Sequence, residues 1–271
     1  MGNGILTASV IVGMIAVGVT AALLSDNKSS GKKAAGNTVR NNFTPAAINN
    51  SSEDEVAFTN DEDFDFNVKK GCVTLVSYNG SDSIVRIPDI VNEIADNAFE
   101  GCTAEDIEIP DEVEEIGESA FCDCKNLKSV TLPYGLKKLG AYAFKGCEAL
   151  EDIEIPDDIE NIGEETFAEC TSLTKITLPY NLKKIGASAF SGCEILSELE
   201  IPDSVKSIGE NAFNGCTNLE KVYLPDSIES LGENDEDSDV FDGCENISVE
   251  YDGNTYRYGQ LKLLYIRVNC R

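Results

Sequence analysis

The chain has 271 residues, of which 49 are Asp or Glu and 21 are Lys or Arg, so its formal net charge at pH 7 is -28. This charge excludes a general electrostatic attraction to nucleic acid or to an anionic membrane surface, because phosphate binding needs clustered Lys and Arg. The chain has no His and no Trp, and without His it lacks the commonest general base and metal ligand.

Residues 1–24 differ from the rest of the chain. Residues 5–24, ILTASVIVGMIAVGVTAALL, contain no charged side chain and are long enough to cross a hydrocarbon core as one helix. We predict one N-terminal apolar helix that serves as an uncleaved transmembrane anchor. A cleaved secretory signal is the alternative, since Val19 and Ala21 suit a cleavage site, although no basic residue precedes the apolar run. A buried soluble helix is a third interpretation.

The basic residues after this segment bear on its orientation. Lys28, Lys32, Lys33 and Arg40 follow it, and no Lys or Arg precedes it. The positive-inside rule alone would therefore keep the bulk of the chain on the cytoplasmic side. Display on the cell surface, which a family resemblance described below implies, requires the opposite orientation. Both orientations stay open.

Two segments precede the main part of the chain. Residues 25–60 are rich in Ser, Asn, Gly and Ala and lack apolar periodicity, which predicts a flexible polar linker. Residues 61–81 alternate apolar and polar side chains and contain Asn79-Gly80, a dipeptide typical of tight turns. We predict that this second segment is an N-terminal cap in the form of a β-hairpin.

Residues 82–247 contain seven repeats of about 23 residues, and three residue types recur in step. The recurring positions are Pro88, Pro110, Pro133, Pro156, Pro179, Pro202 and Pro225; then Phe99, Phe121, Phe144, Phe167, Phe190, Phe213 and Phe241; and, three residues after each Phe, Cys102, Cys124, Cys147, Cys170, Cys193, Cys216 and Cys244. A unit of this size cannot bury an apolar face alone, so the repeats must stack and share one core.

Each repeat divides into three parts. The first contains alternating apolar residues that end at the Pro, such as Ile153 and Ile155 before Pro156, and predicts a short strand. The second, typified by Ile-Gly at residues 162–163, continues the inner lining, and we expect its Gly to turn the chain. The third contains the Phe and Cys and is expected to close the coil through a helical or 3₁₀-like turn.

These residues resemble the bacterial leucine-rich repeat of the Treponema and BspA-like type, whose unit reads L-x-x-I-x-I-P-x-x-V-x-x-I-G-x-x-A-F-x-x-C. LEDIEIPDDIENIGEETFAEC and LSELEIPDSVKSIGENAFNGC match that unit nearly letter for letter, and the resemblance covers about residues 70–258. It implies an α/β repeat solenoid, a curved rod with short parallel strands and β-hairpin caps. It also implies protein binding and adhesion at the surface of host-associated bacteria and some protists.

The surface charge alternates between successive repeats. DIEIPDEVEEIG and DIEIPDDIENIG alternate with VTLPYGLKKLG and ITLPYNLKKIG, so the duplicated unit has 46 residues. Since stacked strands lie about 4.8 Å apart, equivalent residues become neighbours. We expect Lys137 and Lys138 to lie between Glu114 and Glu115 on one side and Glu160 on the other. This pattern avoids like-charge stacking; an alternative role is to be recognised by a ligand.

The end of the chain is a predicted C-terminal cap, residues 248–271. Asp252-Gly253 lies between two alternating runs, which predicts a second hairpin, and residues 259–270 are expected to form a helix, with a strand as the alternative. The preceding repeat has an insertion in which Asp235, Asp237 and Asp239 alternate, as in a calcium loop. The Gly and the final Glu of such a loop are missing, so we favour a solvated acidic bulge over a weak cation site.

The cysteines of the repeats should form an inward-facing column of free thiols, because Cys packs as a small apolar residue and parallel side chains disfavour a disulfide. Cys72, Cys122 and Cys270 lie off that column, and a bond between two of them stays open. A catalytic Cys/His pair, a nucleophile elbow and a phosphate-binding loop are all missing. We therefore predict a non-catalytic chain without a cofactor.

The candidate binding surface consists of outward-facing residues on the predicted strands and of residues that follow the Pro. The first group contains Glu108, Thr131, Glu154, Thr177, Glu200 and Tyr223, and the second contributes Tyr134 and Tyr180. Tyr is enriched in contact hot spots, although rim tyrosines also serve packing. We predict a protein or glycan ligand for a surface-displayed domain; the alternative is a membrane-tethered scaffold that faces the cytoplasm. The oligomeric state stays open.

Overall fold

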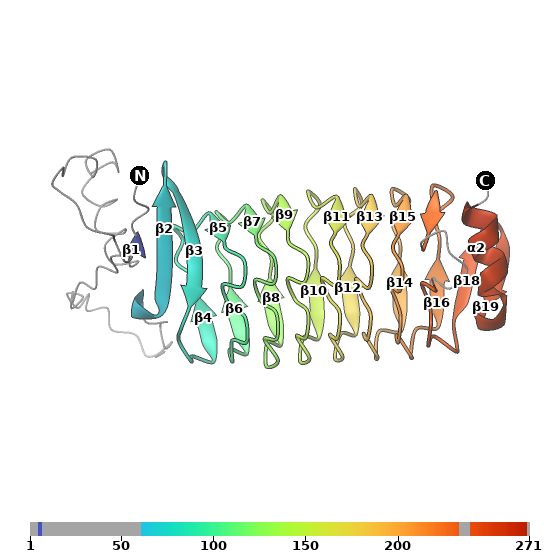
Figure 1. Ribbon diagram of the computed structural model, residues 1–271, viewed down its shortest axis with the longest axis horizontal. Coiled ribbons are helices and arrows are strands. Elements are labelled where there is room, and N and C mark those ends of the chain that lie inside the picture. The colour runs from blue at the N-terminus through green and yellow to red at the C-terminus, as the bar shows by residue number, and fades with distance from the viewer. Residues whose placement is uncertain (1–4, 7–60, 233–238, 270–271) are drawn as a thin grey trace, which may run out of the picture.

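The computed structural model describes residues 5–6, 61–232 and 239–269. These residues form a β-solenoid whose turns stack side by side along one nearly straight axis (Figure 1). We number turns 1 to 7 by their first strands, β4, β6, β8, β10, β12, β14 and β16. Most of the predicted N-terminal helix and the whole of the predicted linker, residues 25–60, lie outside the described residues.

Each turn contributes two short parallel strands, and each set forms one row along the rod. The first row contains β4 (Ile84–Arg86), β6 (Asp106–Glu108), β8 (Ser129–Thr131), β10 (Asp152–Glu154), β12 (Lys175–Thr177), β14 (Glu198–Glu200), β16 (Lys221–Tyr223) and, from the cap, β18 (Ser248–Tyr251). The second row contains β5 (Glu93–Ile94), β7 (Glu115–Ile116), β9 (Lys138–Leu139), β11 (Asn161–Ile162), β13 (Lys184–Ile185), β15 (Ser207–Ile208) and β17 (Ser230–Leu231).

The core is built from columns of equivalent side chains. The seven repeat Phe are buried and their rings stack from turn to turn, with centroids 5.1–5.6 Å apart. Tyr78 of the N-terminal cap continues this stack at 5.3 Å from Phe99. Apolar residues of both strand rows complete the interior. Because every turn shares its apolar surface with its neighbours, the rod has one continuous core.

The corner of each turn contains no regular helix among the described residues, and of the two predicted forms, helical or 3₁₀-like, it is nearer the second. Tyr142 and Gly146 both have positive φ (60° and 70°), and backbone in that region cannot continue a right-handed helix. Alternate corner amides bond to the next turn, as in Phe144 N–H to the carbonyl of Thr166 at 2.9 Å. The amides between them bond three residues back, as in Cys147 N–H to the carbonyl of Phe144 at 3.2 Å, which is the bond of a 3₁₀-like turn. The repeats are therefore all β within the described residues, and the α/β prediction was wrong for them.

The straight axis also differs from the predicted curvature. A leucine-rich rod curves when the elements on one face are wider than the strands on the other. Here both faces consist of strand rows, so neither face carries a wider element such as a helix (Figure 1).

A Gly follows each of the second-row strands from β7 to β15, and it serves close packing. A Cβ on Gly186 would lie 2.5 Å from the carbonyl carbon of Gly163 in the preceding turn, and neither residue has positive φ. The expectation that these glycines turn the chain was therefore wrong: they let the backbones of neighbouring turns approach.

The N-terminal end is covered by a hairpin. After the 3₁₀ turn η2 (Asp61–Asp63), β2 (Phe64–Lys69) pairs antiparallel with β3 (Cys72–Tyr78), and β3 continues the second row by pairing with β5. The hairpin turn is Lys70-Gly71, both with positive φ, and not the predicted Asn79-Gly80. The short β1 (Ile5–Leu6) pairs antiparallel with β2, so these two residues are not helical.

The C-terminal end is covered by a hairpin and a helix. β18 pairs with β19 (Asn254–Arg257) around Asp252-Gly253, as predicted, and η3 (Tyr258–Gln260) leads into α2 (Leu261–Asn269). The side-chain amide of Asn269 both accepts from the N–H and donates to the carbonyl of Leu231 at 2.9 Å, which satisfies the end of the second row. No helix in the described part of the chain is long and apolar enough to cross a membrane.

Candidate binding face

The predicted outward-facing residues form one column on the first strand row. Strand register pairs Arg86 with Glu108 and Glu108 with Thr131, and further along the rod it pairs Glu200 with Tyr223. All eight candidate binding residues are exposed. The sequence pattern therefore identified which side chains point outward. We call this surface the outer face and define it by this column together with the residues that follow each Pro.

The tyrosines are the most exposed large residues of the outer face. Tyr134 and Tyr180 are 85% and 66% exposed, and Tyr223 is 48% exposed. Tyr223 has partners within the chain: Lys221 Nζ lies 4.4 Å from its ring centroid and 3.2 Å from Glu250. A cation between an aromatic ring and a carboxylate is a stabilised arrangement. The three tyrosines thus share a face but differ in how far they are already engaged.

The first strand row is interrupted twice. β4, β6 and β8 form one sheet, β10 and β12 a second, and β14, β16, β18 and β19 a third. The breaks fall between β8 and β10 and between β12 and β14, at the boundaries of the 46-residue units. Sequence reasoning missed these breaks, although the 46-residue period is the signal that marks their positions.

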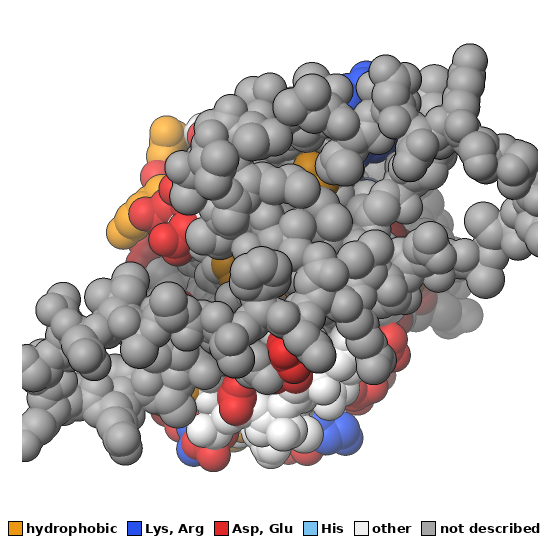
Figure 2. Space-filling model, turned by 90° about the vertical axis from the view of Figure 1, so that its left-hand side faces the viewer, with side chains coloured by type: hydrophobic (Ala, Val, Ile, Leu, Met, Phe, Trp, Pro, Cys, Tyr) orange, Lys and Arg blue, Asp and Glu red, His pale blue; other side chains and the backbone are white. Residues whose placement is uncertain are grey.

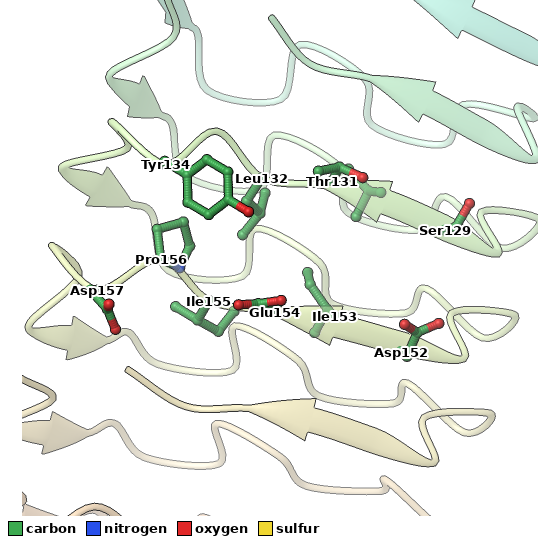
Figure 3. Close-up of a pocket in the computed structure, with 11 residues that line it drawn as sticks. Ser129, Thr131, Leu132, Tyr134, Asp152, Ile153, Glu154, Ile155, Pro156 and Asp157 are labelled. Atoms are coloured by element: carbon green, nitrogen blue, oxygen red, sulfur yellow. The ribbon is translucent and has the colours of Figure 1, made fainter. Parts of the chain in front are cut away.

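A hollow of about 230 Å³ lies at the first break. Its polar lining consists of Ser129, Thr131 and Tyr134 from turn 3 and Asp152, Glu154 and Asp157 from turn 4. Figure 3 shows Tyr134 and Pro156 at one end of the hollow and Ser129 and Asp152 at the other. We call this hollow the β8–β10 groove.

The carboxylates of the β8–β10 groove have no counter-ion. Asp152, Glu154 and Asp157 make no ion pair with any Lys or Arg among the described residues, whereas Glu108 on the same face pairs with Arg86 at 2.9 Å. Their mutual repulsion is not relieved internally, so the groove carries a local negative potential. In the end-on view, most charged side chains visible around the uncovered rim are acidic (Figure 2).

The alternating charges pair between turns only in part as expected. Lys137 lies 2.8 Å from Glu114 and Lys138 lies 3.6 Å from Glu115, as predicted. On the other side, neither lysine forms an ion pair with Glu160 among the described residues. The second row is also interrupted, between β9 and β11, so turns 3 and 4 are not held together by either strand row.

The cysteine column is a structural feature of the core. Six of its seven members are buried, Cys102 is half-buried, and no described Cys forms a disulfide. Each buried thiol donates to the carbonyl of the Phe one turn back, as in Cys170 Sγ to Phe144 O at 3.2 Å. Burial raises the pKa of Cys193 to about 12, so this thiol stays protonated and unreactive at neutral pH. Cys72 and Cys122 are free and half-buried, and Cys270 lies outside the described residues.

The predicted cation site is only partly described. Asp235 and Asp237 lie outside the described residues. Asp239 accepts hydrogen bonds from the Tyr265 hydroxyl and from Phe241 N–H, and burial together with this contact raises the pKa of Tyr265. The carboxylate of Asp239 therefore links the last turn to α2. No cluster of metal-binding side chains occurs in the part of the chain that the structure describes.

Comparisons with known proteins identify similar repeats. A sequence profile described as a BspA type leucine rich repeat region with six copies matches residues 92–220 and 183–260. A leucine rich cell surface protein from Faecalibacterium prausnitzii is 29% identical. The match covers 76% of this chain and 59% of that protein, with a TM-score of 0.63. The leucine rich repeat protein of Treponema pallidum is 30% identical, and the match covers 71% of this chain and 80% of that protein, with a TM-score of 0.52.

A leucine-rich repeat protein from Bacteroides ovatus is 33% identical over 63% of this chain and 54% of its own, with a TM-score of 0.57. The chain thus spans somewhat more than half of the Faecalibacterium and Bacteroides proteins. No curated protein matches it. These similarities concern the repeats that build the outer face.

Proposed function

Because the chain belongs to the BspA-type leucine-rich repeat family, we propose that it is a non-catalytic, surface-displayed domain that binds a protein partner through the outer face. The observation that carries the proposal is the β8–β10 groove, where an 85% exposed Tyr134 lines the same hollow as three carboxylates that have no counter-ion among the described residues. Members of this family are repeat proteins of the binding type.

The exposure of Tyr134 and Tyr180 supports binding over packing. A tyrosine that served packing alone would bury most of its ring, yet these two leave 85% and 66% of their surface in solvent. Tyr supplies a large contact area at low conformational cost and is enriched among residues that dominate binding energy.

The chemistry of the described residues supports a non-catalytic role. The buried thiols donate to backbone carbonyls, and their raised pKa keeps them from acting as nucleophiles. Solenoids present extended surfaces and bind along them. A hollow as shallow and open as the β8–β10 groove suits contact with a partner's side chains.

Affinity capture tests the proposed face. The full-length chain is immobilised and challenged with a mixture of extracellular proteins, in parallel with the variant Tyr134→Ala/Tyr180→Ala/Tyr223→Ala. We expect the variant to lose a protein that the original chain retains, because all three rings lie on the contact surface. Leu263→Ala is the matched control, since Leu263 is a 60% exposed apolar residue on α2, off the outer face. Equal capture by the triple variant would remove the outer face from consideration.

Display at the cell surface is the remaining part of the proposal. It is supported by the similarity to the Faecalibacterium leucine rich cell surface protein. The basic residues Lys28, Lys32, Lys33 and Arg40 favour the alternative, a scaffold that faces the cytoplasm. Protease added to intact cells distinguishes the two, because only a displayed domain is cut before the cells are lysed.

A further inference from the structure

The break between β8 and β10 gives the outer face an opening at a defined place. The two strands belong to different sheets and share no register pair, so their backbones do not close over the hollow. The floor consists of apolar side chains such as Leu132 and Ile155, and the carboxylates and Tyr134 stand around it (Figure 3). The groove therefore offers apolar contact and charge within one site.

The negative charge of the groove determines the sign of the charge that its occupant carries. Three carboxylates line it and no Lys or Arg does, and the whole chain has a net charge of -28. Such a field attracts cationic groups and disfavours anionic ones. The occupant must therefore carry basic side chains at the points where it enters the groove.

The outer face itself shows how a basic side chain is held. On turn 7, Lys221 lies over the Tyr223 ring at 4.4 Å and reaches Glu250 on the next strand at 3.2 Å. The residue equivalent to Lys221 on turn 3 is Ser129, and the residue equivalent to Tyr223 is Thr131, so turn 3 supplies no cation to Glu154 from within the described part of the chain. A Lys or Arg from a partner can supply the missing charge.

The distance between the two most exposed tyrosines constrains the repeat length of a partner that contacts both. Tyr180 follows Tyr134 by 46 residues, which is two turns, and Glu200 and Asp203 of the next turn occupy the positions of Glu154 and Asp157, while Lys175 replaces Ser129. Adjacent strands lie about 4.8 Å apart, so the two tyrosines are separated by roughly 10 Å along the rod. A polyproline II helix returns to the same face every three residues, which is about 9.3 Å. The two repeats therefore match closely.

Polyproline II segments also suit the type of side chain present. Grooves lined by aromatic residues recognise this conformation, because a preformed extended helix loses little entropy on binding. Tyr134 with the neighbouring Pro156 forms such an aromatic and apolar edge (Figure 3). Building on the proposed function, we infer that the partner presents a basic polyproline II segment, with Lys or Arg at every third position, along the outer face across Tyr134 and Tyr180.

Binding of labelled synthetic peptides tests this inference. The first peptide repeats Pro-Pro-Lys over about 15 residues; the second has the same composition with all lysines at one end; the third repeats Pro-Pro-Glu. Fluorescence anisotropy with the full-length chain should show binding of the first peptide, about tenfold weaker binding of the second and none of the third. Equal affinity for the first two would mean that charge alone attracts them and would overturn the inference.

Variants locate the contact. Tyr134→Ala and Tyr180→Ala should each weaken binding of the Pro-Pro-Lys peptide by about fivefold or more, and Glu154→Gln/Asp157→Asn should do the same. Leu263→Ala and Glu100→Gln are the matched controls for apolar and charge loss away from the outer face, and they should leave the affinity unchanged. Circular dichroism confirms that each variant is folded. Loss of affinity in the controls alone would place the peptide elsewhere and would refute the inference.

The peptide and capture experiments separate two failures. If the tyrosine variants lose capture of a natural partner but no peptide binds, the partner chemistry inferred here is wrong and the proposed function stands. If the peptide binds as expected while capture is unaffected by the tyrosine variants, the proposed function is wrong for this face. A partner that is a glycan would belong to the first of these cases.

Discussion

Replacing Thr166 by Val should stabilise the rod. Thr166 occupies a column that is Ala or Val in the other turns, is fully buried, and its hydroxyl oxygen has no hydrogen-bond partner. A buried hydroxyl without a partner costs about 1–3 kcal/mol, and Val keeps the shape of Thr while removing that hydroxyl. Val240 at the equivalent position of turn 7 is also fully buried, so the column accommodates this side chain. We expect an increase of roughly 1–2 kcal/mol in the free energy of unfolding.

Urea and thermal unfolding followed by circular dichroism measure the effect. A gain of 1 kcal/mol corresponds to a rise of about 2–4 °C in Tm for a domain of this size. Two controls separate the effect of the hydroxyl on stability from the effect of side-chain volume. Thr166→Ser keeps the hydroxyl and removes a methyl group, which should lower the stability by about 1 kcal/mol. Ala189→Thr places a hydroxyl in the same column of turn 5 and should also destabilise. A Thr166→Val variant no more stable than the original chain would refute the reasoning.

Further predictions concern the aromatic column, the thiols and the surface charges. Phe167→Ala should cost about 3–5 kcal/mol, because Phe167 is fully buried and stacks on Phe144 and Phe190; urea unfolding with Phe167→Leu as the milder control tests this. Burial raises the pKa of Cys193 to about 12 from 9.0, so its contribution to stability is complete below pH 9 and is lost as the pH rises through about 12; unfolding measured across that range should show the decline, and Cys193→Ala should reduce it. Lys137→Glu should destabilise by at most about 1 kcal/mol, since the pair with Glu114 is largely exposed; the loss should vanish at high salt, and an effect that persists there would contradict an electrostatic origin.

The repeat skeleton was predictable from the sequence because each of its positions has one dominant physical role. Phe, Cys and the apolar strand residues recur at fixed offsets and have nowhere to be buried except against the next turn. The six buried thiols and the outward direction of Glu108 and Tyr223 follow from the same period. These features depend only on the 23-residue period of the repeats, which can be read directly from a single sequence.

The details of the backbone were not predictable in the same way. Glu165 and Ser188 adopt positive φ, which their residue types do not predict. The corners therefore combine turns with i→i−3 bonds and a ladder to the next turn, and their described residues contain no regular helix. Lys70-Gly71 competed with Asn79-Gly80 as the turn of the first hairpin, and the pairing of β2 with β3 decided between them. In both cases contacts with a neighbouring turn or strand override local preference.

The most exposed part of the candidate site lies at the weakest junction of the rod. Between turns 3 and 4 both strand rows are interrupted, and the corner ladder, in which Tyr142, Phe144 and Gly146 donate to turn 4, provides most of the backbone hydrogen bonds. At the same junction the described residues show no ion pair from Lys137 or Lys138 to Glu160, and the β8–β10 groove opens beside Tyr134. Strand pairing satisfies backbone groups and closes the surface, so a rod with perfect pairing would lack this hollow. The core column keeps the turns stacked there, with the rings of Phe144 and Phe167 5.6 Å apart and almost parallel, and this stacking lets the outer face open without dividing the solenoid.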